Sequence, residues 1–247
     1  MKTMLITGAS RGIGAATALL AAEQGYTVAL NYNRNKEAAE SVVNLIHSRG
    51  GRAKAFRADV SREEEVICLF KAVEEEYGPL DALVNNAGIL EVQCLSEHIS
   101  AERWQRMFTN NTMSVFFCCR EAIQQMAVKY GGKGGTIVNV SSIAAKTGSP
   151  FEYMDYAASK GATDTLTIGL AKELAGEKIR VNGVRPAFIY TDIHADGGEP
   201  TRVDRIKNSI PLKRGGHASE VAEAILWLAS DKSSYSTGIF IDVTGGM

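Results

Sequence analysis

Short apolar runs alternate with longer segments of helical periodicity along this chain. Each short run is bounded by turn residues, which is typical of a buried β-strand; the expected strands are residues 4–6, 27–30, 53–57, 80–84, 136–140, 179–184 and 239–243. Helices are expected between them, at residues 12–24, 36–48, 61–77, 101–130, 156–175 and 219–230. Repeated βα units of this kind predict an α/β fold with a doubly wound parallel sheet of about seven strands and helices on both faces.

Local signals define the ends of several helices. Gly25 is expected to end the first helix, and the pattern Ser61-x-x-Glu64 predicts a capping box at the start of the third. One long helix is expected over residues 101–130, up to a glycine-rich break. Residues 186–213 lack a clean period, and residues 192–213 are too long for a simple connection, so we expect a substrate lid at roughly residues 190–213.

Composition limits the classes of function. The chain has 247 residues, enough for one domain over residues 1–247, and a net charge of −1, which gives no electrostatic footprint for nucleic acid or an anionic membrane. It has no apolar run near 18 residues and no signal-peptide pattern, so we expect a cytoplasmic protein. The four cysteines are interpreted as reduced, mostly buried thiols, and the four scattered histidines indicate no metal site.

The ends of the expected strands collect the candidate site residues. In an open parallel sheet, ligands bind outside the carboxyl ends of the strands. Thr7-Gly8, Asp59, Asn86, Ser142 and Pro186 each follow a strand. We therefore expect them along one edge of the sheet, which would form the site.

A glycine-rich turn joins the first strand to the first helix. Residues 7–14 read Thr-Gly-Ala-Ser-Arg-Gly-Ile-Gly, with the spacing Gly-x3-Gly-x-Gly. Glycines let backbone N–H groups approach a pyrophosphate, and a helix N-terminus favours its negative charge. The same pattern occurs in purely structural turns, but its place at the first βα junction favours a dinucleotide site in a Rossmann-type fold.

Tyr156 and Lys160 are four residues apart on an expected helix and share one face. The pKa of a free phenol, near 10, is too high for acid–base work at neutral pH, and a nearby cation lowers it. Tyr32 and Lys36 have the same spacing, so the pair alone is a weak signal. The residues that precede it make Tyr156 the stronger candidate.

These motifs together resemble the short-chain dehydrogenase/reductase family, and most closely its bacterial 3-oxoacyl-carrier-protein-reductase-like and glucose-dehydrogenase-like members. The resemblance covers essentially the whole chain and rests on motifs in the family's order and rough spacing: Thr7-Gly8-x3-Gly12-x-Gly14, Asn85-Asn86-Ala87-Gly88, Ser142, Tyr156-x3-Lys160 and Pro186-x4-Thr191. It implies that Tyr156 exchanges a proton with the substrate oxygen and that Ser142 hydrogen-bonds the same oxygen. Lys160 would lower the pKa of Tyr156 and hold the nicotinamide ribose.

The family's fourth catalytic residue is an asparagine that orders a water for proton relay. Asn110 and Asn111 are both available, and the register counted back from Val115-Phe116 favours Asn111. The resemblance also implies a set of cofactor contacts that follows the strand ends: Gly8, Ser10, Gly12, Ile13, Gly14, Asp59, Val60, Asn86, Ala87, Gly88, Pro186, Ile189 and Thr191.

The residues after the second strand bear on the choice of cofactor. An acidic residue there binds the ribose of NAD, whereas an arginine accommodates the 2′-phosphate of NADP. This chain reads Asn31-Tyr32-Asn33-Arg34 at that point, without a carboxylate, and Arg11 adds a second cation. We therefore predict NADP, with NAD less favoured and with Asn33, Arg34, Arg11 and Ser10 around the phosphate. The alternative is that Arg34 is an ordinary solvated loop residue.

The chain departs from the family pattern at two places. Ala187 follows Pro186 where the family usually has glycine, which would strain the backbone if φ were positive there. Ser142 and Tyr156 are 14 positions apart, where 13 is more usual. Phe151 and Tyr153, in the segment with the extra residue, are candidates for the substrate mouth or for surface packing.

Within residues 190–213, Tyr190, Ile193 and His194 are candidate substrate contacts, while Arg202, Arg205 and Lys207 are interpreted as a solvated helix face. The expected protein is an NADP-dependent oxidoreductase acting on a small-molecule carbonyl or secondary alcohol. Alternatives are an NAD(P)-dependent sugar or polyol dehydrogenase and a catalytically silent NADP-binding sensor. The family resemblance also implies a homo-oligomer, a tetramer or a dimer.

Overall fold

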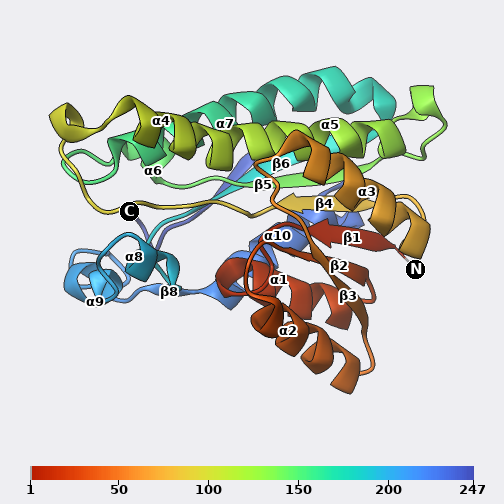
Figure 1. Ribbon diagram of the computed structural model, residues 1–247, viewed down its shortest axis with the longest axis horizontal. Helices are drawn as coiled ribbons and strands as arrows, with labels where there is room; N and C mark the ends of the chain where they lie inside the picture. Colours follow the sequence, from red (N-terminus) through yellow and green to blue (C-terminus); the bar gives the residue numbers. More distant parts are fainter. Residues whose placement is uncertain (1) are drawn as a thin grey trace.

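Within residues 2–247, which the computed structural model describes, seven parallel strands form the central sheet in the order β3-β2-β1-β4-β5-β6-β9 (Figure 1). The chain builds the sheet outward from β1 to β3 and then crosses to β4 on the other side of β1. The strands are β1 (Thr3–Ile6), β2 (Thr27–Tyr32), β3 (Arg52–Arg57), β4 (Ala82–Asn85), β5 (Gly135–Val140), β6 (Ile179–Pro186) and β9 (Phe240–Val243). This confirms the predicted doubly wound Rossmann-type sheet.

Helices cover both faces of the sheet (Figure 1). The long ones are α1 (Gly12–Glu23), α2 (Lys36–Ser48), α3 (Glu63–Tyr77), α4 (Ala101–Phe108), α5 (Ser114–Met126), α7 (Met154–Leu174) and α10 (Ala218–Ala229). Shorter elements are α6 (Ala144–Thr147), α8 (Ile193–Asp196), α9 (Arg202–Ile206) and the paired strands β7 (Ile189–Tyr190) and β8 (Gly216–His217).

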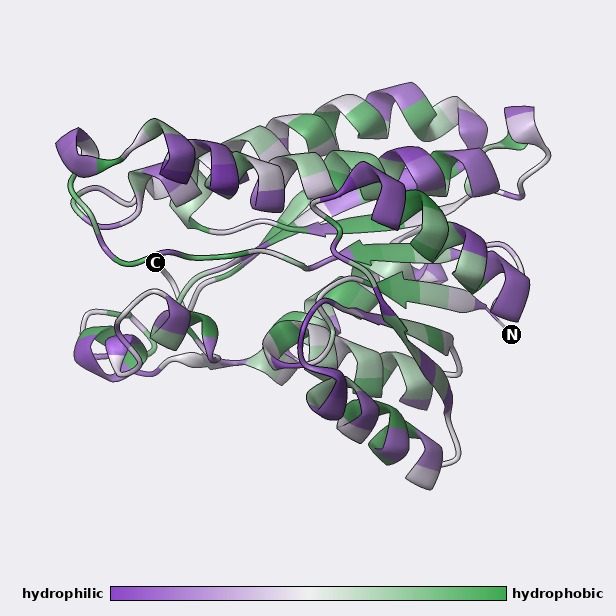
Figure 2. Cartoon of the chain, viewed as in Figure 1, coloured by the Kyte–Doolittle hydropathy of each residue, from purple (hydrophilic) through white to green (hydrophobic). Residues whose placement is uncertain are grey.

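The core lies in two layers, one on each side of the sheet. Met4 and Ile6 of β1 pack in the layer with α1, α2 and α10, whereas Leu5 packs in the layer with α3, α5 and α7. Because successive side chains of a strand point to opposite faces, a strand buried on both faces is apolar throughout. Figure 2 shows the same pattern, with hydrophobic residues on the central strands and hydrophilic residues on the outer helices.

Two local predictions are wrong. The expected helix over residues 101–130 is interrupted, because a π-turn (Thr109–Met113) separates α4 from α5. The expected capping box is also absent from the start of α3, where Arg62 is the N-cap and makes no side-chain cap bond. The Ser61 hydroxyl instead donates to Asp59 Oδ1 at 2.6 Å, because a carboxylate two residues earlier competes for it.

Candidate active site

The glycine-rich turn after β1 packs directly against the end of β4. Gly8 has φ +61°, and a Cβ at this position would lie 2.9 Å from the Ala87 Cα. A Cβ on Gly14 would lie 2.5 Å from Asn86 Nδ2 and 2.6 Å from the Gly8 carbonyl oxygen. Both positions therefore require glycine: there is no space for a Cβ at either, and Gly8 also has a positive φ.

Hydrogen bonds fasten this turn to β4. Thr7 Oγ1 accepts from the backbone N–H groups of Asn86 and Ala87, each at 3.0 Å. Asn86 Nδ2 donates to the carbonyl oxygens of Thr7 and Gly8 at 2.9 and 3.0 Å. The predicted cofactor residue Asn86 thus already uses its side-chain amide to hold the turn in place.

Asn31 holds the other side of the turn and was not among the predicted site residues. Its Oδ1 accepts from the Gly8 N–H at 3.2 Å, and its Nδ2 donates to the Ala58 carbonyl at 3.1 Å. It is buried, with 2 % of its surface exposed. A polar residue extending the apolar run of residues 27–30 was the sequence signal that could have identified it.

The predicted phosphate-binding residues have different partners. Arg34 and Asn33 are exposed and act on Asp59. Burial opposes ionisation of Asp59, but hydrogen bonds from Ser61 and Asn33 and the charge of Arg34 outweigh it, so the pKa of Asp59 is lowered. Arg11 instead pairs with Asp196 of α8.

The remaining predicted residues of this edge are partly or fully buried. Ser10 and Ile13 are half-buried and Val60 is buried. Thr191, in the chain after β6, approaches the turn, since a Cβ on Gly12 would lie 3.4 Å from Thr191 Cγ2.

The residue after Pro186 does not strain the backbone. Among residues 2–247 the non-glycine residues with positive φ are Ser149, Phe151, Lys178 and Lys213, so Ala187 is in an ordinary conformation. Its N–H donates to the Val243 carbonyl at 3.1 Å, and the nearby Ile189 is buried. The departure from glycine therefore has no conformational cost here.

Helix α7 brings Lys160 to the end of β5. Lys160 is 3 % exposed, and its Nζ donates to the Val140 carbonyl at 2.9 Å. The same Nζ lies 5.7 Å from the centre of the Tyr156 ring. Burial lowers the pKa of Lys160 to about 8, against a smaller raising effect of Asp164. The ammonium therefore remains the main form at pH 7.

Ser142 and Tyr156 lie together beside this lysine. Burial raises the pKa of Tyr156, and a hydrogen bond with Ser142 opposes the rise. The pKa of Tyr156 is therefore raised, whereas the sequence predicted that Lys160 would lower it. The reason is that a buried phenolate loses its hydration. Ser142 Oγ also accepts from the Ala144 N–H at 3.1 Å.

The π-turn directs Asn111 inward. Its Oδ1 accepts from the Ile89 N–H at 2.7 Å, and its Nδ2 donates to the Ile89 carbonyl at 3.1 Å and to Ser159 Oγ at 3.2 Å. Asn110 points elsewhere and donates to the Arg106 carbonyl at 2.8 Å. Of the two candidate asparagines, Asn111 therefore lies in the site; a Cβ on Gly88 would lie 3.1 Å from its Oδ1 and 3.5 Å from Lys160 Nζ.

Residues 190–213 are docked onto the chain just before α7. The Tyr153 hydroxyl donates to the Gly197 carbonyl at 3.2 Å. Arg202 lies 4.6 Å from the Tyr153 ring centre and 5.4 Å from that of Phe188, and it pairs with Glu152. The prediction that Arg202 is solvated is therefore wrong, since its guanidinium is covered by two aromatic rings and a carboxylate.

The candidate substrate contacts have different surroundings. His194 is buried, its Nε2 is 3.0 Å from the Ile189 carbonyl oxygen, and burial lowers its pKa. Tyr190 donates to Asp204 Oδ1 at 3.2 Å, and Ile193 is half-buried. Phe151 is 80 % exposed, which favours the surface interpretation for it.

Among residues 2–247 no group of three or more histidine, cysteine, aspartate or glutamate side chains is arranged to hold a metal ion. All four cysteines are free; Cys118 and Cys119 are buried, whereas Cys68 is exposed and Cys94 is half-buried. No helix in residues 2–247 is long and apolar enough to cross a membrane.

Comparisons with known proteins agree with this geometry. A family profile described as "Enoyl-(Acyl carrier protein) reductase" matches residues 8–247. The chain is 59 % identical to the uncharacterized oxidoreductase YgfF of Escherichia coli (strain K12) over 100 % of both chains. It is 40 % identical to the 3-oxoacyl-[acyl-carrier-protein] reductase FabG of Staphylococcus aureus (strain N315), over 100 % of this chain and 98 % of that one.

A solved structure gives the same result for the fold. A dehydrogenase/reductase from Sinorhizobium meliloti 1021 superposes with a TM-score of 0.91 at 32 % identity, over 99 % of this chain and 94 % of that one. Full-length matches at this level establish the family and the class of reaction. The chain belongs to the short-chain dehydrogenase/reductase family and is an oxidoreductase that acts on a CH–OH or carbonyl group.

Proposed function

We propose that this enzyme transfers hydride between NADP and a carbonyl or secondary alcohol, with Tyr156 as the general acid or base. The observation that carries the proposal is the convergence of Ser142, Tyr156 and Lys160 at the end of β5. A protein that only bound the cofactor would need no proton donor there, which argues against the silent sensor. The FabG name of a 40 % identical relative supports a carbonyl substrate.

The residues at the sheet edge fit a dinucleotide. The first turn of α1 has no acidic residue and its N-cap makes no side-chain bond, so its N–H groups suit a pyrophosphate. Arg34 and Ser10 would meet the 2′-phosphate, Asp59 and Val60 the adenine, and Asn86 to Gly88 the adenosine ribose. Pro186, Ile189 and Thr191 would hold the nicotinamide end, and Tyr156 and Lys160 its ribose. When bound, the nicotinamide supplies or accepts the hydride.

The side chains of this chain would manage the proton. Because burial raises the pKa of Tyr156, the phenol is protonated at neutral pH and suits carbonyl reduction, in which it donates to the developing alkoxide. Ser142 donates to the same oxygen and stabilises its charge. Lys160, as a cation, would favour the phenolate that remains, and Asn111 would order a water for proton relay.

A substrate panel tests the proposal. NADPH oxidation is measured with ketones, 3-oxoacyl thioesters and sugars, and we expect turnover that Tyr156→Phe lowers at least about 100-fold. Tight NADPH binding without oxidation of NADPH by any substrate of the panel would favour the sensor. Wild-type turnover by Tyr156→Phe would exclude Tyr156 as the proton donor. Preference for sugars with NAD would favour the alternative dehydrogenase.

Cofactor preference has its own test. We expect a higher kcat/KM with NADPH than with NADH, and Arg34→Ala should raise the KM for NADPH about tenfold while leaving that for NADH unchanged. Arg49→Ala is the matched control, because Arg49 is another exposed arginine and pairs with Glu23 away from the turn. Equal or better kinetics with NADH in the wild type would refute the preference.

We also propose that residues 190–213 form a substrate lid and that the chain is a homo-oligomer, a dimer or tetramer. Met113 and Phe116, three positions apart, are 46 % and 45 % exposed on one helical face, which suits burial against a second copy. Light scattering on the eluted protein should give a mass of two or four chains. A monomer at micromolar concentration would refute the oligomer.

A further inference from the structure

Helix α7 begins without the usual side-chain cap. Its N-cap residue, Tyr153, makes no cap hydrogen bond, so the N–H groups of the first turn need another acceptor. Asp155 provides one, since its Oδ1 accepts from the Tyr156 N–H at 2.9 Å. The Asp155 carboxylate is completely buried. A buried anion at this point needs a partner, because its desolvation is costly.

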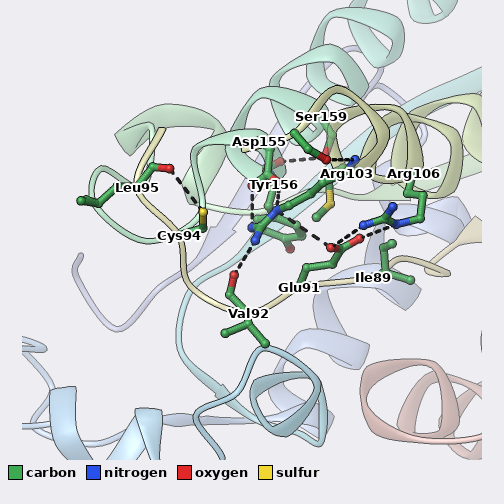
Figure 3. Close-up of polar contacts among 12 residues, drawn as sticks. Ile89, Glu91, Val92, Cys94, Leu95, Arg103, Arg106, Asp155, Tyr156 and Ser159 are labelled. Atoms are coloured by element: carbon green, nitrogen blue, oxygen red, sulfur yellow. Dashed lines mark hydrogen bonds and ion pairs between the residues drawn. The ribbon is translucent and has the colours of Figure 1, made fainter. Parts of the chain in front are cut away.

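Arg103 of α4 is that partner (Figure 3). Its Nε donates to Asp155 Oδ2 at 2.7 Å, its Nη2 to Oδ1 at 3.3 Å, and its Nη1 to the Val92 carbonyl at 2.7 Å. The Arg103 side chain is only 12 % exposed. The planar fork of the guanidinium thus fixes the start of α7 to both α4 and the loop after β4.

Other charges lie on the outer side of this pair. Glu91 Oε2 is 4.0 Å from Arg103 Nε, and both Glu91 oxygens accept from Arg106 at 3.1 Å. Figure 3 shows this outer pair on the side of Arg103 away from Ser159. Glu91 is already shared with Arg106, so Asp155 is the principal partner of Arg103.

The carbonyl of Tyr156 is held as well. Ser159 Oγ donates to it at 2.7 Å, and Asn111 Nδ2 donates to Ser159 Oγ at 3.2 Å. Both polar backbone groups of Tyr156 are therefore bonded to side chains that are themselves fixed by α4 or the π-turn. Because the phenol is attached to this backbone, the same contacts limit where the hydroxyl can lie.

We propose that Asp155, held by Arg103, is a positioning residue for Tyr156. This inference rests on the proposed function, in which Tyr156 transfers the proton. A buried ion pair adds little stability compared with apolar residues of similar size, so stability alone does not account for it. Proton transfer requires the phenol within hydrogen-bond reach of the substrate oxygen, and small displacements are costly.

Two substitutions at Asp155 separate its contacts. Asp155→Asn keeps an oxygen for the Tyr156 N–H but removes the charge paired with Arg103, whereas Asp155→Ala removes both. We expect kcat to fall about 10- to 100-fold in the alanine variant and less in the asparagine variant, with the KM for NADPH nearly unchanged. Arg103→Lys, which keeps the charge but loses the fork, should also lower kcat.

Leu174→Ala is the control for loss of stability. Leu174 is buried at the other end of α7, about 27 Å from Tyr156 along the helix axis. Its variant should be destabilised but keep kcat per folded molecule, with the folded fraction measured by circular dichroism. If Asp155→Ala does not fold, the asparagine and Arg103→Lys variants carry the comparison.

Three results would overturn the inference. The first is a wild-type kcat in Asp155→Ala or, if this variant does not fold, in both Asp155→Asn and Arg103→Lys. The second is a change in KM while kcat stays at the wild-type value. The third is an equal loss of kcat in Leu174→Ala at the same folded fraction. Tyr156→Phe distinguishes failure of the proposed function from failure of the positioning role. If that variant retains turnover, the proposed function itself fails; if it is inactive while Asp155→Ala is fully active, only the positioning role fails.

Discussion

Replacing Lys160 with methionine is expected to stabilise the protein at neutral pH while abolishing turnover. Lys160 is 3 % exposed, and burial lowers its pKa from 10.5 to about 8. A shift of one unit corresponds to about 1.4 kcal/mol, so the buried ammonium costs about 3 kcal/mol at pH 7. Methionine removes this cost but leaves the Val140 carbonyl without its 2.9 Å partner, which costs about 1–2 kcal/mol. The net expectation is a gain of about 1–2 kcal/mol.

The pH dependence gives this prediction its sign. Below pH 8, Lys160 is protonated in both the folded and the unfolded protein, and the full cost of burial is present. Between pH 8 and 10.5 the folded protein releases the proton while the unfolded chain keeps it, so wild-type stability rises with pH. The variant has no such group. The difference in stability should therefore shrink and change sign as the pH approaches 10.5.

The assay is urea unfolding followed by tryptophan fluorescence at several pH values from 7 to 10.5, at fixed protein concentration and without added cofactor. Other groups titrate in both proteins and cancel in the difference. Lys172→Met is the control, because Lys172 is an exposed lysine of the same helix and has no burial cost. A stability difference that stays constant over this range, or a variant less stable than the wild type at pH 7, would contradict a burial cost at Lys160.

Three further predictions concern other parts of the fold. Gly8→Ala places a side chain at φ +61° and 2.9 Å from the Ala87 Cα, so NADPH affinity in a fluorescence titration should fall about tenfold or more; unchanged affinity would contradict the close packing of the turn. Asp196→Asn removes the charged partner of Arg11 and should speed proteolysis within the proposed lid. An unchanged cleavage rate would mean that this ion pair does not keep the lid docked. Cys119, whose pKa burial raises to about 12, should resist a thiol reagent at pH 8, as mass spectrometry would detect.

The sheet could be predicted from the sequence because its signal is local. A parallel strand buried on both faces is a short apolar run, and the seven runs that were predicted match the seven strands of the central sheet to within a few residues. Residues that follow strands then share one edge, which brought Gly8, Asn86, Ser142 and Pro186 into one site without any knowledge of side-chain contacts.

The contacts between distant residues could not be predicted in this way. Arg202 was interpreted as solvated because it lies among other charged residues, yet two aromatic rings cover it. The π-turn that directs Asn111 inward leaves no periodic signal, since it only adds a residue to a helical run. Arg103 and Asp155 are 52 positions apart, and each has the ordinary appearance of a helix-surface charge.

Helix α7 nevertheless contained a usable signal. It carries Asp155, Lys160 and Asp164, and all three are buried. Each has a partner outside the helix: Asp155 pairs with Arg103, Lys160 binds the Val140 carbonyl, and Asp164 accepts from Arg185 at 2.8 Å. In addition, Ser159, Thr163 and Thr167 interrupt the face of α7 that carries Leu170 and Leu174, so this helix of 21 residues lacks the continuous apolar stripe of a surface helix. We infer that the charges buried on α7 serve the reaction and lower the stability of the protein. The pH dependence of the stability of Lys160→Met would measure this cost for Lys160.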